Sequence, residues 1–262
     1  MEAPIQPDET LDSLLDKDLK IIQKRRGYRY SIDAILLAHF CRLRRGDKVI
    51  DLGTGNAIIP ILLAARGEAA QIVGVEIQGD CLDMAYRSLA LNKMQERIRL
   101  IQGDVRDLPG DLMKASFDVA ISNPPYRPVQ SGRVNPYPQK ALARHEILGS
   151  LKDMAQAASF LLRPRGRFHV IYPASRTADM LLALRESGLE PKRIRIVYAN
   201  AKEDARLIMA QAVKGGRTEM QVLKPLFVYD TDGCYTREMQ KIYGLFQGSS
   251  EVTALRHENE SN

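Results

Sequence analysis

The four residues Asn123-Pro124-Pro125-Tyr126 carry the groups in this sequence best suited to chemistry at a planar nitrogen. The Asn123 side-chain oxygen and the Pro124 carbonyl are two acceptors for the two N–H groups of an amine or amide. Accepting both bonds draws such a nitrogen toward sp³ geometry and directs its lone pair at an electrophilic carbon, with no strong general base required. The prolines hold the turn rigid, and Tyr126 can stack on a base. The motif therefore predicts chemistry at an exocyclic nitrogen such as N6 of adenine.

A glycine turn, Asp51-Leu52-Gly53-Thr54-Gly55-Asn56-Ala57, directly follows the first apolar strand of the main domain. Its glycines let the backbone approach a ligand, and the next helix presents its N-terminus there. An acid at the head of the turn would repel a pyrophosphate but suits an ammonium or sulfonium group. A purely structural turn is the alternative interpretation.

Two more acids follow the second and third strands. Glu76, with Ile77 after it, stands where a carboxylate can accept bonds from both hydroxyls of a ribose. Asp104, with Val105 after it, can accept from the amino group of an adenine; capping of a helix over 105–108 is its structural alternative. A surface position is the alternative for Glu76.

Residues 127–144 follow the Asn-Pro-Pro-Tyr motif and contain basic residues but no acidic residue. Four prolines and glycines in this stretch predict an irregular loop. Such a loop can bind phosphates that flank a target base, although a solvated surface is the simpler alternative. The candidate RNA-binding residues are Arg127, Arg133, Lys140 and Arg144.

Apolar strands alternate with helices along the chain, which predicts right-handed crossovers and a mostly parallel sheet. We expect strands over 48–52, 71–77, 98–102, 117–122, 166–172, 193–198 and 207–213, and helices over 57–66, 80–93, 145–162 and 177–187. Asp80 is the expected N-cap of the second helix. No helix separates the last two strands, so we expect them to form an antiparallel hairpin at one edge.

The 262 residues suffice for one large α/β domain, and a net charge of +6 favours a polyanionic partner. No apolar run is long enough for a membrane span, and the acidic start lacks a secretory signal. Cys41, Cys81 and Cys234 are expected to be free thiols in a reducing cytosol. No cluster of histidines or cysteines predicts a metal site, and His39 and His145-Glu146 are interpreted as structural.

The chain is expected to divide into an acidic N-terminal tail over 1–18, one domain over 19–247, and a disordered tail over 248–262. Within the first segment, residues 1–10 are expected to be disordered or loosely docked, because they contain two prolines and little apolar content.

Together these motifs resemble the Rossmann-like class I methyltransferases, in the branch with an Asn-Pro-Pro-Tyr motif, and most closely the bacterial tRNA(Val) adenine-N6-methyltransferase family. The resemblance covers about residues 20 to 245. Its flanking motifs are Tyr28-Arg29-Tyr30-Ser31-Ile32-Asp33-Ala34-Ile35-Leu36-Leu37, Ala143-Arg144-His145-Glu146, Pro225-Leu226-Phe227-Val228-Tyr229 and Asp232-Gly233-Cys234-Tyr235-Thr236-Arg237-Glu238.

The resemblance implies a seven-stranded, mostly parallel sheet with an antiparallel edge hairpin and helices on both faces. It implies S-adenosylmethionine as cofactor, S-adenosylhomocysteine as product, and the adenine next to the anticodon of a tRNA as target. The implied catalytic residues are Asn123, Pro124, Pro125 and Tyr126. The implied cofactor contacts are Tyr30, Asp33, Asp51, Gly53, Gly55, Asn56, Glu76, Ile77, Asp104, Val105 and Asn123.

Tyr30 and Asp33 belong to a segment that folds over the methionine end of the cofactor in related enzymes; a helix capped by Ser31 is the alternative. Ala57 departs from the family, which commonly has a third glycine there, and we expect its methyl group only to tighten packing. We further expect a cytoplasmic monomer with no membrane contact and no obligatory protein partner.

Several other functions stay open. A protein glutamine N5-methyltransferase would share the nitrogen chemistry but carries a helical N-terminal domain, and fewer than 50 residues precede the first strand here. A DNA adenine methyltransferase would need a recognition domain. A guanine-N2 RNA methyltransferase often has Phe in place of Tyr126 and a duplicated domain. A non-catalytic RNA-binding module and an NAD-linked oxidoreductase are the remaining alternatives.

Overall fold

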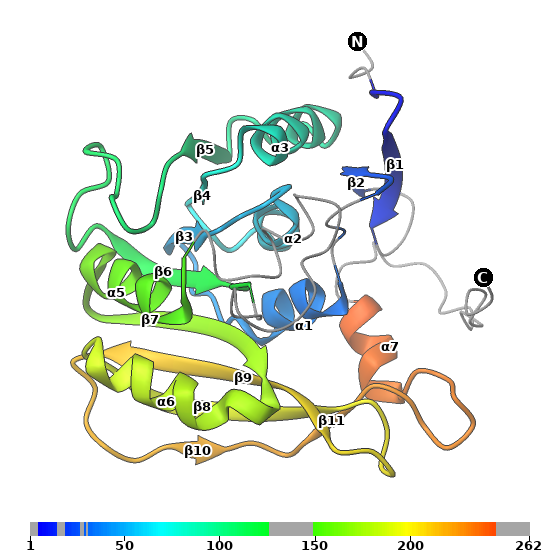
Figure 1. Cartoon of the computed structure of the whole chain (residues 1–262), viewed down its shortest axis with the longest axis vertical. Coiled ribbons are helices and arrows are strands. Elements are labelled where there is room, and N and C mark those ends of the chain that lie inside the picture. The colour runs from blue at the N-terminus through cyan, green and yellow to red at the C-terminus, as the bar shows by residue number, and fades with distance from the viewer. Residues whose placement is uncertain (1–4, 15–18, 27–28, 30, 126–148, 245–262) are drawn as a thin grey trace.

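The computed structural model describes residues 5–14, 19–26, 29, 31–125 and 149–244. Its centre is a nine-stranded sheet in the order β10-β8-β9-β7-β6-β3-β4-β5, with β11 also paired to β8 (Figure 1). Its strands are β3 (Lys48–Leu52), β4 (Gln71–Glu76), β5 (Ile98–Gln102), β6 (Phe117–Ser122), β7 (Leu162–Pro173), β8 (Leu189–Tyr198), β9 (Ala205–Lys214), β10 (Gln221–Val222) and β11 (Leu226–Phe227).

The sheet is mostly parallel, as the alternation of strands and helices predicts. Strand β9 alone runs against its neighbours, and it lies between β7 and β8. The seven predicted strands are β3 to β9. The short strands β10 and β11 were not predicted. Both pair in parallel with β8, so the predicted hairpin of β8 and β9 does not form the outer edge of the sheet.

Helices cover both faces of the sheet because successive strand residues point to opposite sides. Val49 of β3 belongs to the core under α1, α2, α3 and α7, whereas its neighbour Ile50 belongs to the core under α5 and α6. The helices are α1 (Ile32–Phe40), α2 (Ile58–Arg66), α3 (Gly79–Leu91), α5 (Leu151–Leu161), α6 (Thr177–Glu186) and α7 (Arg237–Gly244), with a 3₁₀ turn η1 (Ala174–Arg176).

An antiparallel hairpin of β1 (Glu9–Leu14) and β2 (Leu19–Lys24) replaces the tail expected near the N-terminus. The free edge of β2 binds α3 through side chains: Ser88 Oγ accepts from Ile22 N at 2.9 Å, and the Asn92 amide bonds both N–H and C=O of Lys20. Leu14 is fully buried in the main core. These contacts satisfy the backbone groups at the edge of β2 and hold the hairpin on the domain.

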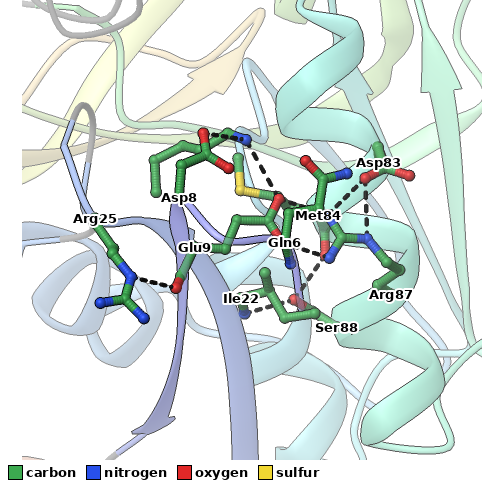
Figure 2. A network of polar contacts seen from close by, with 10 residues as sticks. Gln6, Asp8, Glu9, Ile22, Arg25, Asp83, Met84, Arg87 and Ser88 are labelled. Carbon is green, nitrogen blue, oxygen red and sulfur yellow. Dashed lines mark hydrogen bonds and ion pairs between the residues drawn. The ribbon is translucent and has the colours of Figure 1, made fainter. Parts of the chain in front are cut away.

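A network of polar contacts fixes the start of this hairpin (Figure 2). The Glu9 carboxylate is buried and accepts two bonds from the Arg87 guanidinium of α3, at 2.7 and 2.8 Å. It also accepts from Gln6 N at 2.9 Å, and Arg87 pairs in turn with Asp83. The bond from Arg87 is the largest of the causes that lower the pKa of Glu9 to about 2.

The starts of α3 and α5 differ from the sequence prediction for reasons of capping. Helix α3 begins at Gly79 with Gln78 as N-cap, so Asp80 lies in the first turn and not at the cap. Helix α5 begins at Leu151, because Ser150 and Asp153 form a reciprocal capping box that starts the helix there. Residues 145–148 of the longer predicted helix lie outside the described residues. Among the described residues, no helix has the length and apolar character needed to cross a bilayer.

Candidate functional site

Four adjacent parallel strands, β6, β3, β4 and β5, end at one edge of the sheet. Each of them is followed by one of the predicted motifs. Asp51 pairs in register with Ile121 of β6, and Glu76 with Gln102 of β5. Open α/β sheets bind ligands at the carboxyl ends of their strands. The structure therefore brings the separate sequence motifs together at the edge to which the arrows of β3 and β6 point in Figure 1.

The glycine turn after β3 is held against β4. Gly53 N and Thr54 N both donate to Val75 O at 2.9 Å, and Gly53 and Gly55 have φ angles of 74° and 57°. A side chain other than hydrogen at Gly74 would meet the Thr54 side chain at 2.9 Å. Gly74, which the sequence analysis did not single out, thus allows the turn to pack closely against β4.

Asp51 lies buried beneath this turn with half of its carboxylate unsatisfied. Its Oδ2 accepts from Thr54 Oγ1 at 2.7 Å, whereas Oδ1 has no hydrogen-bond partner among the described residues. Burial, together with the nearby charge of Glu76, raises the pKa of Asp51 to about 7. The side-chain oxygen of Asn56 is also buried and has no hydrogen-bond partner in the part of the chain that the structure describes. Unsatisfied buried acceptors are uncommon in proteins and call for an explanation.

Glu76 bridges the turns that follow β3 and β4. Its Oε2 accepts from Gly55 N at 2.8 Å, and its Oε1 accepts from Gln78 N at 2.9 Å. Burial raises the pKa of Glu76 despite these bonds. The backbone of the glycine turn and the end of β4 are therefore locked to one carboxylate, and Ile77 beside it is half-buried.

These acceptors fit S-adenosylmethionine. The site offers a buried, unpartnered carboxylate oxygen at Asp51, an unpartnered amide oxygen at Asn56 and the carboxylate of Glu76. A ligand with a positive charge and with hydroxyl or amine donors would satisfy them, whereas a pyrophosphate would be repelled by the two carboxylates. Asp51, Asn56 and Glu76 would hold that cofactor.

Asp104 lies at the same edge after β5, but it is engaged locally. Both of its carboxylate oxygens accept from the Arg106 guanidinium, which lowers the pKa of Asp104. A bridge between Asp104 and Asp107 closes a turn here, so the alternative of a helix capped by Asp104 is wrong. Val105 is buried in the core under α5.

Asn123 directly follows β6 and is half-buried, Pro124 is buried, and Pro125 is half-buried. The hydroxyl of Ser122, which the sequence analysis had not noted, donates to Leu52 O at 2.8 Å and ties the end of β6 to the end of β3. Asp33 lies half-buried in the first turn of α1, which Ser31 precedes as N-cap. Tyr126, Arg127, Arg133, Lys140, Arg144 and Tyr30 lie outside the described residues.

Ala57 does more than tighten packing, which corrects our expectation. It is the N-cap of α2 with φ 64° and ψ 27°, a left-handed conformation that disfavours any side chain. The sequence shows that Ala57 replaces a glycine, but only the structure shows that its backbone is left-handed.

The chain matches known proteins over most of its length. A family model described as a methyltransferase domain matches residues 43–242. A tRNA1(Val) (adenine(37)-N6)-methyltransferase from Tolumonas auensis is 29% identical, over 85% of this chain and 91% of the relative. One from Dyadobacter fermentans is 23% identical, over 83% and 89%. The crystal structure of a predicted O-methyltransferase from Agrobacterium tumefaciens superposes with a TM-score of 0.68 at 23% identity, over 84% of this chain and all of that one.

Proposed function

The chain belongs to the methyltransferase-domain family, and from that premise we propose that it transfers a methyl group from S-adenosylmethionine to the N6 of an adenine in tRNA. The observation that carries the proposal is the position of Asn123 and Pro124. They follow β6, the strand next to β3, whose end bears the buried carboxylate with an unsatisfied oxygen. The proposed acceptors for the target N–H groups, Asn123 and Pro124, therefore follow the strand next to the one that bears Asp51, the acid proposed to bind the cofactor.

Each residue has a proposed part in the reaction. Asp51, Asn56 and Glu76 hold the cofactor, whose sulfonium supplies the methyl group and keeps the electron pair of the broken S–C bond. The Asn123 side-chain oxygen and the Pro124 carbonyl accept from the N6 amine and orient its lone pair. Once the N–C bond forms, the nitrogen releases a proton to water, so no buried general base is needed.

The relatives support adenine in tRNA as the target. The printed names of the two relatives give adenine 37 of tRNA1(Val), and this chain matches them nearly from end to end. A base must leave its stack to reach a pocket at a sheet edge. We propose the adenine next to the anticodon for this chain too, because a loop base is unpaired more readily than a base in a stem.

The proposal extends to the surroundings of the reaction. Arg127, Arg133, Lys140 and Arg144 are proposed to bind RNA phosphates, which is consistent with the net charge of +6. A tRNA substrate places the protein in the cytoplasm. That it works as a monomer, without an obligatory protein partner, stays a prediction that light scattering of the purified protein would check.

The test uses purified protein, labelled S-adenosylmethionine, and RNA from a strain that lacks the gene, so that target sites are open. We expect label in N6-methyladenosine after digestion to nucleosides, and in one tRNA after fractionation. Label in N2-methylguanosine would move the substrate to guanine. Label only in protein glutamine, or no transfer at all, would overturn the proposal.

A further inference from the structure

A groove of about 1000 Å³ opens beside β8 and β11, apart from the residues that hold the cofactor. Its walls come from the loop after β8, from the end of β11, and from residues 229–236. Two of the sequence motifs that the proposed reaction leaves unused, 225–229 and 232–238, supply Phe227, Tyr229 and Thr236 to it. We call it the β8–β11 groove.

This groove lies at the same edge of the sheet as Asn123. Strand β8 is antiparallel to β9, β9 is antiparallel to β7, and β7 is parallel to β6. The carboxyl end of β8 therefore points the same way as the carboxyl end of β6. Three strand spacings of about 4.8 Å separate the two strands sideways, or roughly 14 Å. The register places Ser122 level with Ile194, four residues before β8 ends at Tyr198, so the groove lies roughly 20 Å from Asn123. A single RNA strand entering at Asn123 can reach across that distance with a few nucleotides.

The aromatic walls of the groove are held in place by other rings. Phe227 packs against Tyr198 with centroids 5.4 Å apart, and Tyr229 stacks on Tyr235 at 5.3 Å with an interplanar angle of 11°. Tyr235 stacks in turn on Tyr243 at 5.1 Å. Phe227 and Tyr229 are only half-buried. Such pre-positioned aromatic surfaces bind flat rings with little loss of side-chain entropy.

The lining of the groove offers one cation, Lys202, to an anionic group, beside the carboxylates of Glu203 and Asp230. Glu203 is neutralised by Arg206 and bonded by the Asn200 amide at 2.7 Å, and the Asp230 carboxylate accepts from Asp232 N and Cys234 N at 3.0 Å. By contrast, the Lys202 ammonium is exposed at the rim and makes no ion pair with any side chain in the part of the chain that the structure describes. An aromatic wall beside an unpaired cation matches a base attached to a phosphate.

We propose that the β8–β11 groove binds an unpaired base of the substrate RNA near the target adenine, with a neighbouring phosphate against Lys202. This inference rests on the proposed function. It assigns to Phe227 and Tyr229 the stacking of that base, and to Lys202 an electrostatic contact. These residues position the RNA and take no part in the transfer itself.

The kinetic test compares Phe227→Leu and Lys202→Met with matched controls, Phe160→Leu in α5 and Lys48→Met at the opposite edge of the sheet. Removing one stacking surface should raise KM for tRNA about 5- to 150-fold. The turnover number and KM for S-adenosylmethionine should stay unchanged, as should all constants of the controls. Lys202→Met removes only an exposed side chain and tests the proposal even if Phe227→Leu fails to fold. Unchanged KM for tRNA in both groove variants would overturn the proposal.

A binding test separates this inference from the proposed function. Anticodon-arm RNA with 2-aminopurine at successive positions around the target should show quenching at one position on the wild type, and no quenching on Phe227→Leu. Quenching by both proteins, or by neither, would refute the proposal that the β8–β11 groove binds a base. If quenching behaves as expected but no adenine is methylated, the groove stands and the proposed reaction fails.

Discussion

Glu9 and Asp51 are both 1% exposed, yet their surroundings shift their pKa values in opposite directions. Glu9, in the N-terminal hairpin, receives two bonds from Arg87 and one from Gln6 N, and its pKa falls to about 2. Asp51, under the glycine turn, receives one bond from Thr54, faces the charge of Glu76, and its pKa rises to about 7.

The difference separates a carboxylate used for structure from one kept for a ligand. A buried acid that is fully paired fixes two elements together, in this case β1 and α3. A buried acid without a cation lowers stability unless something else supplies the charge. The turn after β3 has this second property, which points to a positively charged ligand at that edge.

The largest effect is expected from Asn123→Ala, which should impair the reaction without changing the stability of the fold. Asn123→Ala removes one acceptor from the target nitrogen, and we expect the turnover number to fall by about 10²–10³, the range for loss of one oriented hydrogen-bonding group. Cofactor affinity, measured by calorimetry, and melting temperature should hardly change. Full turnover in this variant would remove Asn123 from the proposed reaction.

The reverse result is expected at the hairpin. Arg87→Ala leaves the Glu9 carboxylate buried without its main partner, which should lower the free energy of unfolding by about 3 kcal/mol. Urea denaturation measures this loss, and hydrogen exchange should show β1 and β2 opening first. Arg99→Ala, which removes an ion pair with Asp111 between two exposed side chains, is the control and should change stability by less than about 1 kcal/mol. Equal losses in the two variants would contradict the assigned difference.

The two carboxylates should also respond to pH with opposite signs. Glu9 has a lowered pKa, so its stabilisation is present above about 4.5 and is lost as the pH falls toward 2. Asp51 has a raised pKa, so the folded protein without cofactor loses stability as the pH rises from about 4 toward 7.

Glu9→Gln should remove the first loss of stability and Asp51→Asn the second, and each loss amounts to roughly 3–4 kcal/mol. Denaturation curves of the cofactor-free proteins from pH 3 to 8 provide the measurement. Asp51→Asn should bind S-adenosylmethionine more weakly even where it is more stable. A stability profile for Asp51→Asn that parallels the wild type would argue against a strained carboxylate.

The smallest expected effect concerns the N-cap of α2. Ala57→Gly should raise the free energy of unfolding by roughly 0.5–1 kcal/mol, because glycine adopts φ 64° without a steric penalty. Gly67→Ala is the reverse control. Gly67 has φ 77° and open space around it, so this variant should lower the free energy of unfolding by a similar amount. Thermal denaturation of both variants checks the pair, and a destabilised Ala57→Gly would show that the methyl group is needed for packing.

The sequence by itself determined the sheet and the edge where the motifs meet. Apolar strands alternating with helices require parallel pairing, and parallel strands end on one side, so Asp51, Glu76, Asp104 and Asn123 had to gather there. Local patterns also gave four of the seven main strands to within one residue at each end. Both results follow from short-range periodicity, which a single sequence records directly.

Tertiary structure decided what periodicity does not record. Glu9 is buried only because Arg87, 78 residues away, covers it, and six acids in 1–18 otherwise suggest a tail. Ser150 caps α5, so the helix begins at Leu151, six residues after its predicted start at residue 145. Strands β10 and β11 form because β8 offers a free edge. Partners far apart in the sequence set the pairing, and hence the pKa, of each buried charge. The chain alone placed Asp51 at the edge, but only the fold left one oxygen of its carboxylate without a hydrogen-bond partner among the described residues.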